Sequence, residues 1–179
     1  MHIDKTKTKI RELKNSDLTI INEFIKYEPE LKKFLIEDAI ANQKIGISRT
    51  YYVFCEDKLF GYITILADSL NLDADLKQFF KEKGADYKTL PALKIGRLAV
   101  DDRYLRCGIG TILLEFAYGL AKYTSNSLFG CRFLILDAKR NQDHAKDSVH
   151  FYKKFGFKTF KERNKGTLPM YLDIYLNNR

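Results

Sequence analysis

Two glycines separated by one residue, Gly108 and Gly110, lie between an apolar run and an amphipathic run. A strand that enters a helix through such a loop forms an anion site, because the first N–H groups of the helix have no partner and the helix dipole is positive there. Glycine also lacks the side chain that would keep a phosphate away from those donors. Arg103 and Arg106 can add charge-assisted hydrogen bonds. We therefore expect a phosphate-bearing ligand at this loop, with a tight turn that binds nothing as the alternative.

The loop differs from two common phosphate-binding motifs. A P-loop has Lys followed by Ser or Thr directly after its second glycine, whereas Thr111 and Ile112 follow here. A dinucleotide-binding loop has a third glycine at the position where this chain has Leu113. Both motifs are therefore excluded.

The elements around the loop alternate between strands and helices. Apolar runs predict buried strands over 92–100 and 131–138, and helical spacing predicts helices over 111–124 and 143–155. Gly156 ends the second helix, and two short strands follow at 157–160 and 170–176.

The sequence predicts three strands, two helices and an insertion in the first half of the chain, and the second and third strands form a hairpin. In chain order these are a strand over 8–13, a helix capped at 15–17 whose apolar residues Leu18, Ile21, Phe24 and Ile25 repeat with helical spacing, a helix over 29–42, strands over 49–55 and 59–67, and a polar surface insertion over 68–90 with a helical middle at 75–82. This order predicts an α/β (α+β) fold, with a single domain over residues 1–179 and a mixed twisted sheet of six to seven strands flanked by about four helices.

Composition and charge narrow the class of protein. Hydrophobic residues make up 45% of the chain, and no apolar run approaches the length of about 18 residues that a membrane span needs. Cys55, Cys107 and Cys131 match neither a metal site nor a disulfide framework, so we expect a reducing cytoplasm. Residues 1–90 carry 15 basic and 15 acidic residues, whereas 91–179 carry 16 and 8. The net charge of +8 therefore lies in the second half of the chain. This excess of basic residues indicates a polyanionic partner, with solubility alone as the alternative.

Two segments resemble the GNAT superfamily of N-acetyltransferases. Residues 96–114, GRLAVDDRYLRCGIGTILL, resemble its acetyl-CoA-binding segment, and residues 149–157, VHFYKKFGF, resemble its second signature. Leu105 departs from the Gln or Arg of the family loop, and Ala145 and Ser148 match the second signature weakly. Because the phosphate cradle is mostly backbone, we expect acetyl-CoA binding to survive these departures.

The resemblance implies roles for particular residues. It makes acetyl-CoA the co-substrate, it implies direct attack by a primary amine, and it makes Tyr152 the general acid that protonates the departing thiolate, with a packed structural tyrosine as the alternative. It places the Val100 N–H opposite the thioester oxygen. The implied acetyl-CoA-binding residues are Leu98, Ala99, Val100, Arg106, Cys107, Gly108, Ile109, Gly110 and Thr111. No metal site is expected.

No general base is evident. Asp137, Asp143, His144 and His150 are interpreted as capping or surface residues, and Cys107 as an incidental loop residue. An amine of lowered pKa would need no base.

Further stretches are similar to the toxin acetyltransferases of bacterial toxin–antitoxin pairs, which acetylate the α-amine of aminoacyl-tRNA. These are LDA at 136–138 and LPMYL at 168–172. This interpretation implies tRNA and an antitoxin protein as partners. The candidate RNA surface is Lys139, Arg140, Lys153, Lys158, Lys161, Arg163 and Lys165.

An acetyltransferase for small-molecule or protein amines ranks ahead of the toxin because it is the broader class. A catalytically inactive acyl-CoA-binding module is the third interpretation, and intact Gly108, Gly110 and Tyr152 argue against it. A homodimer formed through the last strands is a further expectation.

Overall fold

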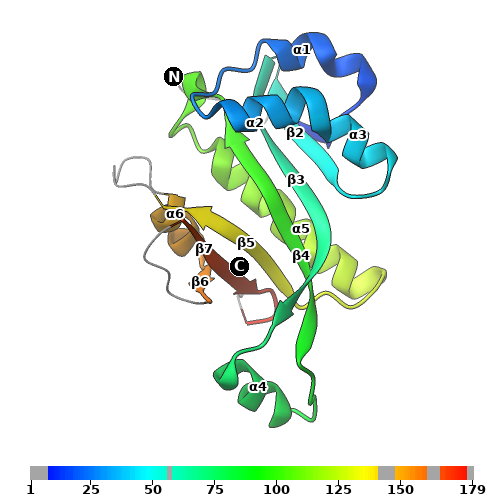
Figure 1. The fold of residues 1–179 in the computed structure, drawn as a ribbon, viewed down its shortest axis with the longest axis vertical. Helices are drawn as coiled ribbons and strands as arrows, with labels where there is room; N and C mark the ends of the chain where they lie inside the picture. The colour runs from blue at the N-terminus through cyan, green and yellow to red at the C-terminus, as the bar shows by residue number, and fades with distance from the viewer. Residues whose placement is uncertain (1–7, 56–57, 141–147, 161–165, 177–179) are drawn as a thin grey trace. The chain divides into compact units, whose positions relative to one another are not determined.

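The computed structural model describes residues 8–55, 58–140, 148–160 and 166–176. They form two compact units, the first made of residues 1–66 and 95–116 and the second of residues 67–94 and 117–179. The strand order is β1-β2-β3-β4 in the first unit and β3-β4-β5-β7-β6 in the second, because β3 and β4 run through both (Figure 1). The seven strands confirm the predicted sheet of six to seven.

The first unit contains strands β1 and β2, parts of β3 and β4, and the N-terminal helices. Its elements are β1 (Lys9–Glu12), the 3₁₀ turn η2 (Asn15–Asp17), α1 (Leu18–Asn22), α2 (Pro29–Lys33), the π-helical segment η3 (Phe34–Asp38), α3 (Ala39–Lys44), β2 (Arg49–Cys55), the first part of β3 (Lys58–Asn71), the last part of β4 (Thr89–Val100), the 3₁₀ turn η4 (Asp102–Tyr104) and the start of α5 (Ile109–Ser127).

The second unit holds the chain's remaining elements. They are the ends of β3 and β4 that flank α4 (Ala74–Lys81), the rest of α5, β5 (Phe133–Lys139), α6 (Ser148–Phe155), β6 (Lys158–Thr159) and β7 (Thr167–Asp173). Strand β7 pairs antiparallel with both β5 and β6. Helix α5 links β4 to β5, its neighbour in the strand order.

The N-terminal helix differs from its prediction. The Asp17 side chain makes no cap hydrogen bond to α1 and instead accepts hydrogen bonds from Arg11 and from the Lys14 N–H. Ile21 and Phe24 are buried, whereas Ile25 is 45% exposed. Helix α1 ends at Asn22, so the apolar spacing continues past the end of the helix.

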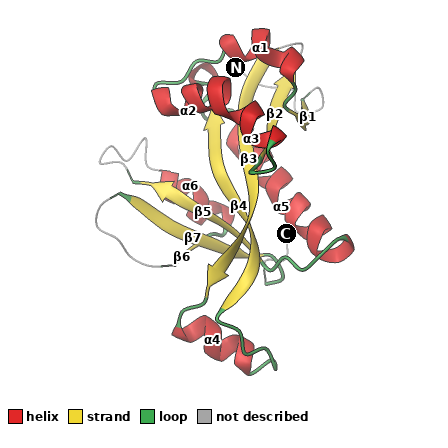
Figure 2. Ribbon diagram, turned by 45° about the vertical axis from the view of Figure 1, so that its right-hand side comes forward, coloured by secondary structure: helices red, strands yellow, loops and turns green. Residues whose placement is uncertain are grey.

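The helical middle predicted for the insertion over 68–90 is confirmed by α4, and the two flanking strands are longer than predicted. Strand β3 continues to Asn71 and β4 begins at Thr89, so only α4 and its flanking turns lie outside the ladder (Figure 2). Phe80 of α4 packs edge-on against Phe133 of β5, with ring centroids 6.0 Å apart. The amphipathic α4 thus packs on the strands of the second unit through its apolar face.

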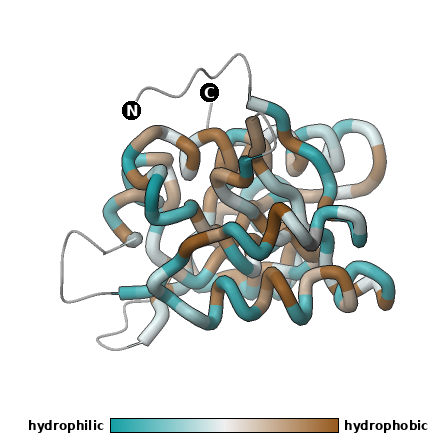
Figure 3. Tube along the Cα trace, turned by 90° about the horizontal axis from the view of Figure 1, so that it is seen from above, coloured by the Kyte–Doolittle hydropathy of each residue, from teal (hydrophilic) through white to brown (hydrophobic). Residues whose placement is uncertain are grey.

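Each unit has its own hydrophobic cluster. In the first unit the buried members are Leu13, Ile21, Phe24, Leu35, Ala39, Tyr52, Leu59, Tyr62 and Ala99. In the second unit they are Leu70, Leu72, Phe80, Ala92, Phe133 and Ile135. Apolar and polar residues alternate along the trace (Figure 3), and no helix of the described residues is both long and apolar enough to cross a membrane.

Candidate active site

The glycine loop is positioned by close packing of α5 on the sheet of the first unit. A Cβ added to Gly61 of β3 would lie 2.8 Å from the Ala99 carbonyl oxygen, 3.1 Å from Ile109 Cγ2 and 3.3 Å from Leu113 Cδ1. Ile109 and Leu113 are themselves almost fully buried. Gly61 therefore lets the first turn of α5 and the end of β4 approach the same point of β3.

The backbone of the loop turns sharply into α5. Arg106 has φ 61° and Gly108 has φ 86°, both in the left-handed region, and the helix begins at Ile109 instead of the predicted Thr111. The first hydrogen bond of α5 runs from the Ile112 N–H to the Gly108 carbonyl at 3.1 Å. Among the described residues no backbone carbonyl accepts from the N–H groups of Ile109, Gly110 and Thr111. They form the positive end of a 19-residue helix, as an anion site requires.

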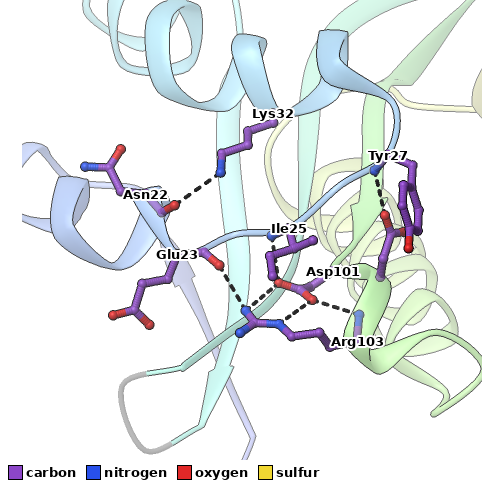
Figure 4. A network of polar contacts seen from close by, with 8 residues as sticks. Asn22, Glu23, Ile25, Tyr27, Lys32, Asp101 and Arg103 are labelled. Carbon is purple, nitrogen blue, oxygen red and sulfur yellow. Dashed lines mark hydrogen bonds and ion pairs between the residues drawn. The ribbon is translucent and has the colours of Figure 1, made fainter.

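The residues just before the loop are held by a buried carboxylate, shown in Figure 4. Asp101 is fully buried and accepts hydrogen bonds from Nε, Nη2 and the backbone N–H of Arg103, and from the backbone N–H of Ile25. Arg103 Nη2 also donates to the Glu23 carbonyl at 3.0 Å. Burial alone would raise the pKa of Asp101, but the hydrogen bonds from Arg103 and Ile25 hold that pKa below its usual value.

This geometry corrects the expected role of Arg103. Its Nε and Nη2 are committed to Asp101, so its main contribution is to brace the chain ahead of the loop. Arg106 is exposed at the loop itself and is the arginine left to meet an anion there.

The neighbouring Asp102 ties the same place to the segment between α1 and α2. Its carboxylate accepts from Lys26 Nζ at 2.7 Å and from the Tyr27 N–H at 2.6 Å. The Asp102 N–H in turn donates to the Ile25 carbonyl at 2.9 Å. The Tyr27 ring, however, is 86% exposed. Residues 25–27 are thus fixed to the start of the glycine loop although they lie about 75 positions away in sequence.

The expected acetyl-CoA-binding strand lies directly before this network. Leu98 and Val100 are half-buried, whereas Ala99 is buried between them. The Asp101 N–H donates to the Phe60 carbonyl at 2.9 Å, which joins the end of β4 to β3. In the loop, Cys107 is half-buried with its Sγ 3.6 Å from the Leu105 carbonyl.

Tyr152 lies in the second unit, on α6. It is only 8% exposed, and its ring contacts Phe151 and Phe157 with centroids 5.2 Å and 5.7 Å away. Burial raises the pKa of its hydroxyl to about 12. Gly156, with φ 110°, ends the helix as predicted. The Tyr152 hydroxyl has no hydrogen-bond partner among the described residues, and burial is the one cause of its raised pKa.

The other candidates take the surface roles predicted for them where the structure describes them. Asp137 forms an ion pair of 2.9 Å with Lys94, and His150 is exposed. Asp143 and His144 lie outside the described residues. No cluster of ligands suited to a metal ion occurs within the described parts of the chain.

The predicted basic surface is partly visible. Lys139, Arg140, Lys153 and Lys158 are exposed in the second unit, and Lys161, Arg163 and Lys165 lie outside the described residues.

Two residues that position the site were not predicted from the sequence, namely Gly61 and the buried Asp101. An isolated glycine inside the apolar β3 was the available signal for Gly61.

A family model for the acetyltransferase (GNAT) domain matches residues 47–159, which is more than half of the chain. The chain belongs to the GNAT acetyltransferase family. The predicted acetyltransferase class is therefore confirmed, and so is acetyl-CoA, the co-substrate of this family. The free N–H groups and the positive φ of Gly108 fit a diphosphate, so the residues present suit this co-substrate.

Individual GNAT proteins are similar over most of this chain. A tRNA-acetylating toxin of Mycobacterium tuberculosis is 28% identical over 142 residues, which cover 79% of this chain and 80% of the relative. A tyrosine-to-phenylalanine mutant of KacT superposes with a TM-score of 0.78 at 21% identity, covering 95% of this chain and 96% of KacT. AtaT complexed with acetyl-methionyl-tRNAfMet superposes with a TM-score of 0.74 at 21% identity, covering 94% and 96%. The two structural likenesses establish the shared fold.

Proposed function

We propose that this GNAT protein is the toxin of a toxin–antitoxin pair and transfers the acetyl group of acetyl-CoA to the α-amine of aminoacyl-tRNA. The similarity to the mycobacterial tRNA-acetylating toxin, over 79% of the chain, carries the proposal. The shared fold with AtaT and the basic second half of the chain support it. The broader interpretation that ranked first from the sequence, acetylation of small-molecule or protein amines, has less support.

Acetyl-CoA binding is assigned to the glycine loop and the strand before it. The N–H groups of Ile109, Gly110 and Thr111 bind the diphosphate, and the exposed Arg106 adds a charge-assisted contact. Gly108 provides the left-handed turn that opens the donors to the ligand. Leu98, Ala99 and Val100 line the acyl end, with the Val100 N–H toward the thioester oxygen, and Cys107 contributes backbone.

Tyr152 is assigned as the group that meets the leaving thiolate. With a pKa raised to about 12, its hydroxyl stays protonated throughout the neutral range and can donate a hydrogen bond to sulfur. A thiol titrates near 8.5 in water, so full proton transfer from such a phenol needs the same apolar surroundings to raise the pKa of the thiol. Tyr152 therefore acts first by stabilising developing negative charge and then as the proton source.

The acceptor explains why no base is needed. An α-amine has a reference pKa of about 8, against about 10.4 for lysine, and a large fraction is therefore neutral near pH 8. Among the described candidate bases, the Asp137 carboxylate is engaged by Lys94. The neutral amine attacks the thioester carbonyl, and the C–S bond breaks as the thiolate takes the Tyr152 proton. The proton that the amine nitrogen loses restores the tyrosine hydroxyl through solvent, and positioning of the amine supplies much of the rate.

The partners follow from this assignment. Lys139, Arg140, Lys153 and Lys158 would contact the phosphates of tRNA, and an antitoxin protein would hold the toxin inactive. AtaT has been solved bound to the C-terminus of its antitoxin AtaR and acetyl-CoA. The substrate and the three free cysteines are compatible with the cytoplasm. Homodimerisation stays a prediction, which sedimentation of the purified chain tests.

The decisive experiment mixes the full chain with acetyl-CoA and one acceptor at a time and follows free thiol. The acceptors are total aminoacyl-tRNA, deacylated tRNA, and a panel of polyamines, amino sugars and lysine peptides. We expect thiol release with aminoacyl-tRNA alone. Mass spectrometry of the nuclease-treated product should find the acetyl group on the aminoacyl nitrogen.

The other outcomes identify the competing functions. Release only with the small amines or peptides contradicts the toxin assignment and points to a metabolic or protein acetyltransferase. No release with any acceptor, together with calorimetric binding of acetyl-CoA, points to an inactive acyl-CoA-binding module.

A further inference from the structure

Arg97 presents an ordered guanidinium on β4, one residue before the strand segment assigned to acetyl-CoA. It is exposed, and its Cζ lies 5.3 Å from the centroid of the Phe34 ring of η3. The Phe34 ring stacks on Tyr62 with centroids 6.4 Å apart and an interplanar angle of 19°. The Tyr62 hydroxyl donates to the Leu31 carbonyl at 2.7 Å, which anchors the far end of this stack.

The stack holds the guanidinium by a cation–π contact, which uses none of its hydrogen-bond donors. One hydrogen bond, from Nη1 to the Gly96 carbonyl at 2.7 Å, fixes the side chain against its own strand. Within the described parts of the chain no carboxylate forms an ion pair with Arg97. Arginine has five N–H donors, so most of its planar fork is free for an anion. The Arg97 side chain therefore loses less conformational entropy when a ligand binds, because folding has already ordered it.

The position of Arg97 favours the acceptor over the acetyl donor as its ligand. The diphosphate of acetyl-CoA is assigned to the α5 N-terminus, beyond the end of β4, whereas Arg97 precedes the acyl-binding residues Leu98 to Val100. An acceptor amine must reach that acyl end. In an aminoacyl ester of RNA, the nearest anion to the amine is the phosphate of the 3′-terminal nucleotide.

We propose that Arg97 is a specificity-determining residue that binds the 3′-terminal phosphate of the aminoacyl-RNA acceptor. This inference rests on the proposed function. Bidentate contact by the guanidinium suits a phosphate, and stacking on Phe34 holds the fork in place for it. Arg97 thereby favours nucleotide-linked amines over free amino acid esters.

The test compares Arg97→Gln and Arg97→Lys with wild type on two acceptors, aminoacyl-tRNA and an aminoacyl-adenosine that carries no phosphate. Lys44→Gln, which removes an exposed cation from α3, is the matched control. We expect Arg97→Gln to raise KM for aminoacyl-tRNA about tenfold or more. Its KM values for aminoacyl-adenosine and acetyl-CoA should stay within about twofold, because neither uses the arginine.

Two further readouts separate charge from fold. Arg97→Lys should recover part of the loss, since lysine supplies the charge but not the fork. The slope of log KM for aminoacyl-tRNA against log salt should fall by about one for Arg97→Gln and stay unchanged for Lys44→Gln.

The outcomes distinguish this inference from the proposed function. If wild type does not acetylate aminoacyl-tRNA, the proposed function fails. If wild type is active and Arg97→Gln changes KM equally for both acceptors or not at all, only the Arg97 inference fails. A rise confined to KM for acetyl-CoA would assign the arginine to a coenzyme phosphate and overturn the inference.

Discussion

The carboxylate of Asp101 and the guanidinium of Arg103 form a two-pronged ion pair, with Nη2 2.7 Å from one carboxylate oxygen and Nε 2.9 Å from the other. The first oxygen also accepts from the Ile25 N–H at 2.9 Å. The pair closes a short stretch of chain directly before the glycine loop and fastens it to Ile25, in the segment that follows α1. Its loss should therefore affect both folding and acetyl-CoA binding.

Replacing Asp101 by Asn should lower the free energy of unfolding by about 3 kcal/mol, because it leaves donors without their charged partner around a fully buried side chain. Urea denaturation followed by circular dichroism measures this loss. Calorimetry at a temperature where the variant is folded should also find weaker acetyl-CoA binding. Asp68→Asn is the control, since its carboxylate is part-exposed and 3.8 Å from Lys94, and it should cost under about 1 kcal/mol. Equal losses in the two variants would contradict the bracing role.

Acid should weaken the fold through Asp17 and Asp101. Burial alone would raise both pKa values, but hydrogen bonds from Arg11 and Arg103, with backbone N–H groups, hold both pKa values below the usual range. A depressed pKa in the folded state means stability that is present above the unfolded pKa of about 3.9 and lost as the pH falls below it. Urea midpoints measured from pH 6 to pH 2.5 should drop for wild type. The drop should be shallower for Asp101→Asn, and parallel curves for the two proteins would refute this assignment.

Replacing Gly61 and Gly119 by alanine should change the free energy of unfolding in opposite directions. At Gly61 the new Cβ would lie 2.8 Å from the Ala99 carbonyl oxygen, which is backbone and cannot rotate away, so we expect a loss of about 1–3 kcal/mol. At Gly119, inside α5, nothing lies within 4 Å of the new Cβ, so alanine should stabilise by about 0.5–1 kcal/mol. Thermal melts of both variants check this. Gly61→Ala should also weaken acetyl-CoA binding, because the first turn of α5 must move.

The two loop glycines should likewise differ from each other. Gly108 has φ 86°, where a Cβ costs about 1–2 kcal/mol, so Gly108→Ala should lower both stability and acetyl-CoA affinity. Gly110 lies in the first turn of α5 and is not among the positive-φ residues, so Gly110→Ala should keep or raise stability. A helical backbone accepts alanine without strain, so we expect acetyl-CoA affinity to change little in Gly110→Ala. Calorimetry measures the acetyl-CoA affinity of both variants, and thermal melts measure their stability. An equal loss of acetyl-CoA affinity in the two variants would argue against the loop geometry.

Tyr152→Phe should separate catalysis from folding. No described group hydrogen-bonds to the hydroxyl, so its removal should change the free energy of unfolding by less than about 1 kcal/mol. Turnover should fall at least tenfold while acetyl-CoA affinity remains nearly unchanged. The rate of thiol release measures turnover, and calorimetry measures acetyl-CoA affinity. Full activity in a folded variant would make Tyr152 a packing residue.

Local pattern in the sequence was sufficient for most of the elements. Strand 49–55 was predicted with its observed bounds, because alternation and a nearby turn are both read over a few residues. The glycine loop followed by a helix was predictable for the same reason, as was the stop at Gly156. The family also came from short contiguous motifs. Boundaries were less accurate: α5 starts at Ile109, and β3 extends to Asn71, because packing partners outside the local pattern prolong both elements.

Contacts between distant segments could be decided only by the tertiary structure. Nothing near Asp101 in sequence indicates that its carboxylate meets the Ile25 N–H, 76 positions away, or that Arg97 stacks on Phe34. Gly61 is read from sequence as a weak point of a strand, and only the approach of Ala99 and Ile109 explains it. Hydrogen-bonding capacity and ring faces are properties of each residue, but their partners depend on which elements the folded chain brings together. The sequence thus determined the class of chemistry, and the three-dimensional packing decided which side chains brace the loop and which remain free to bind.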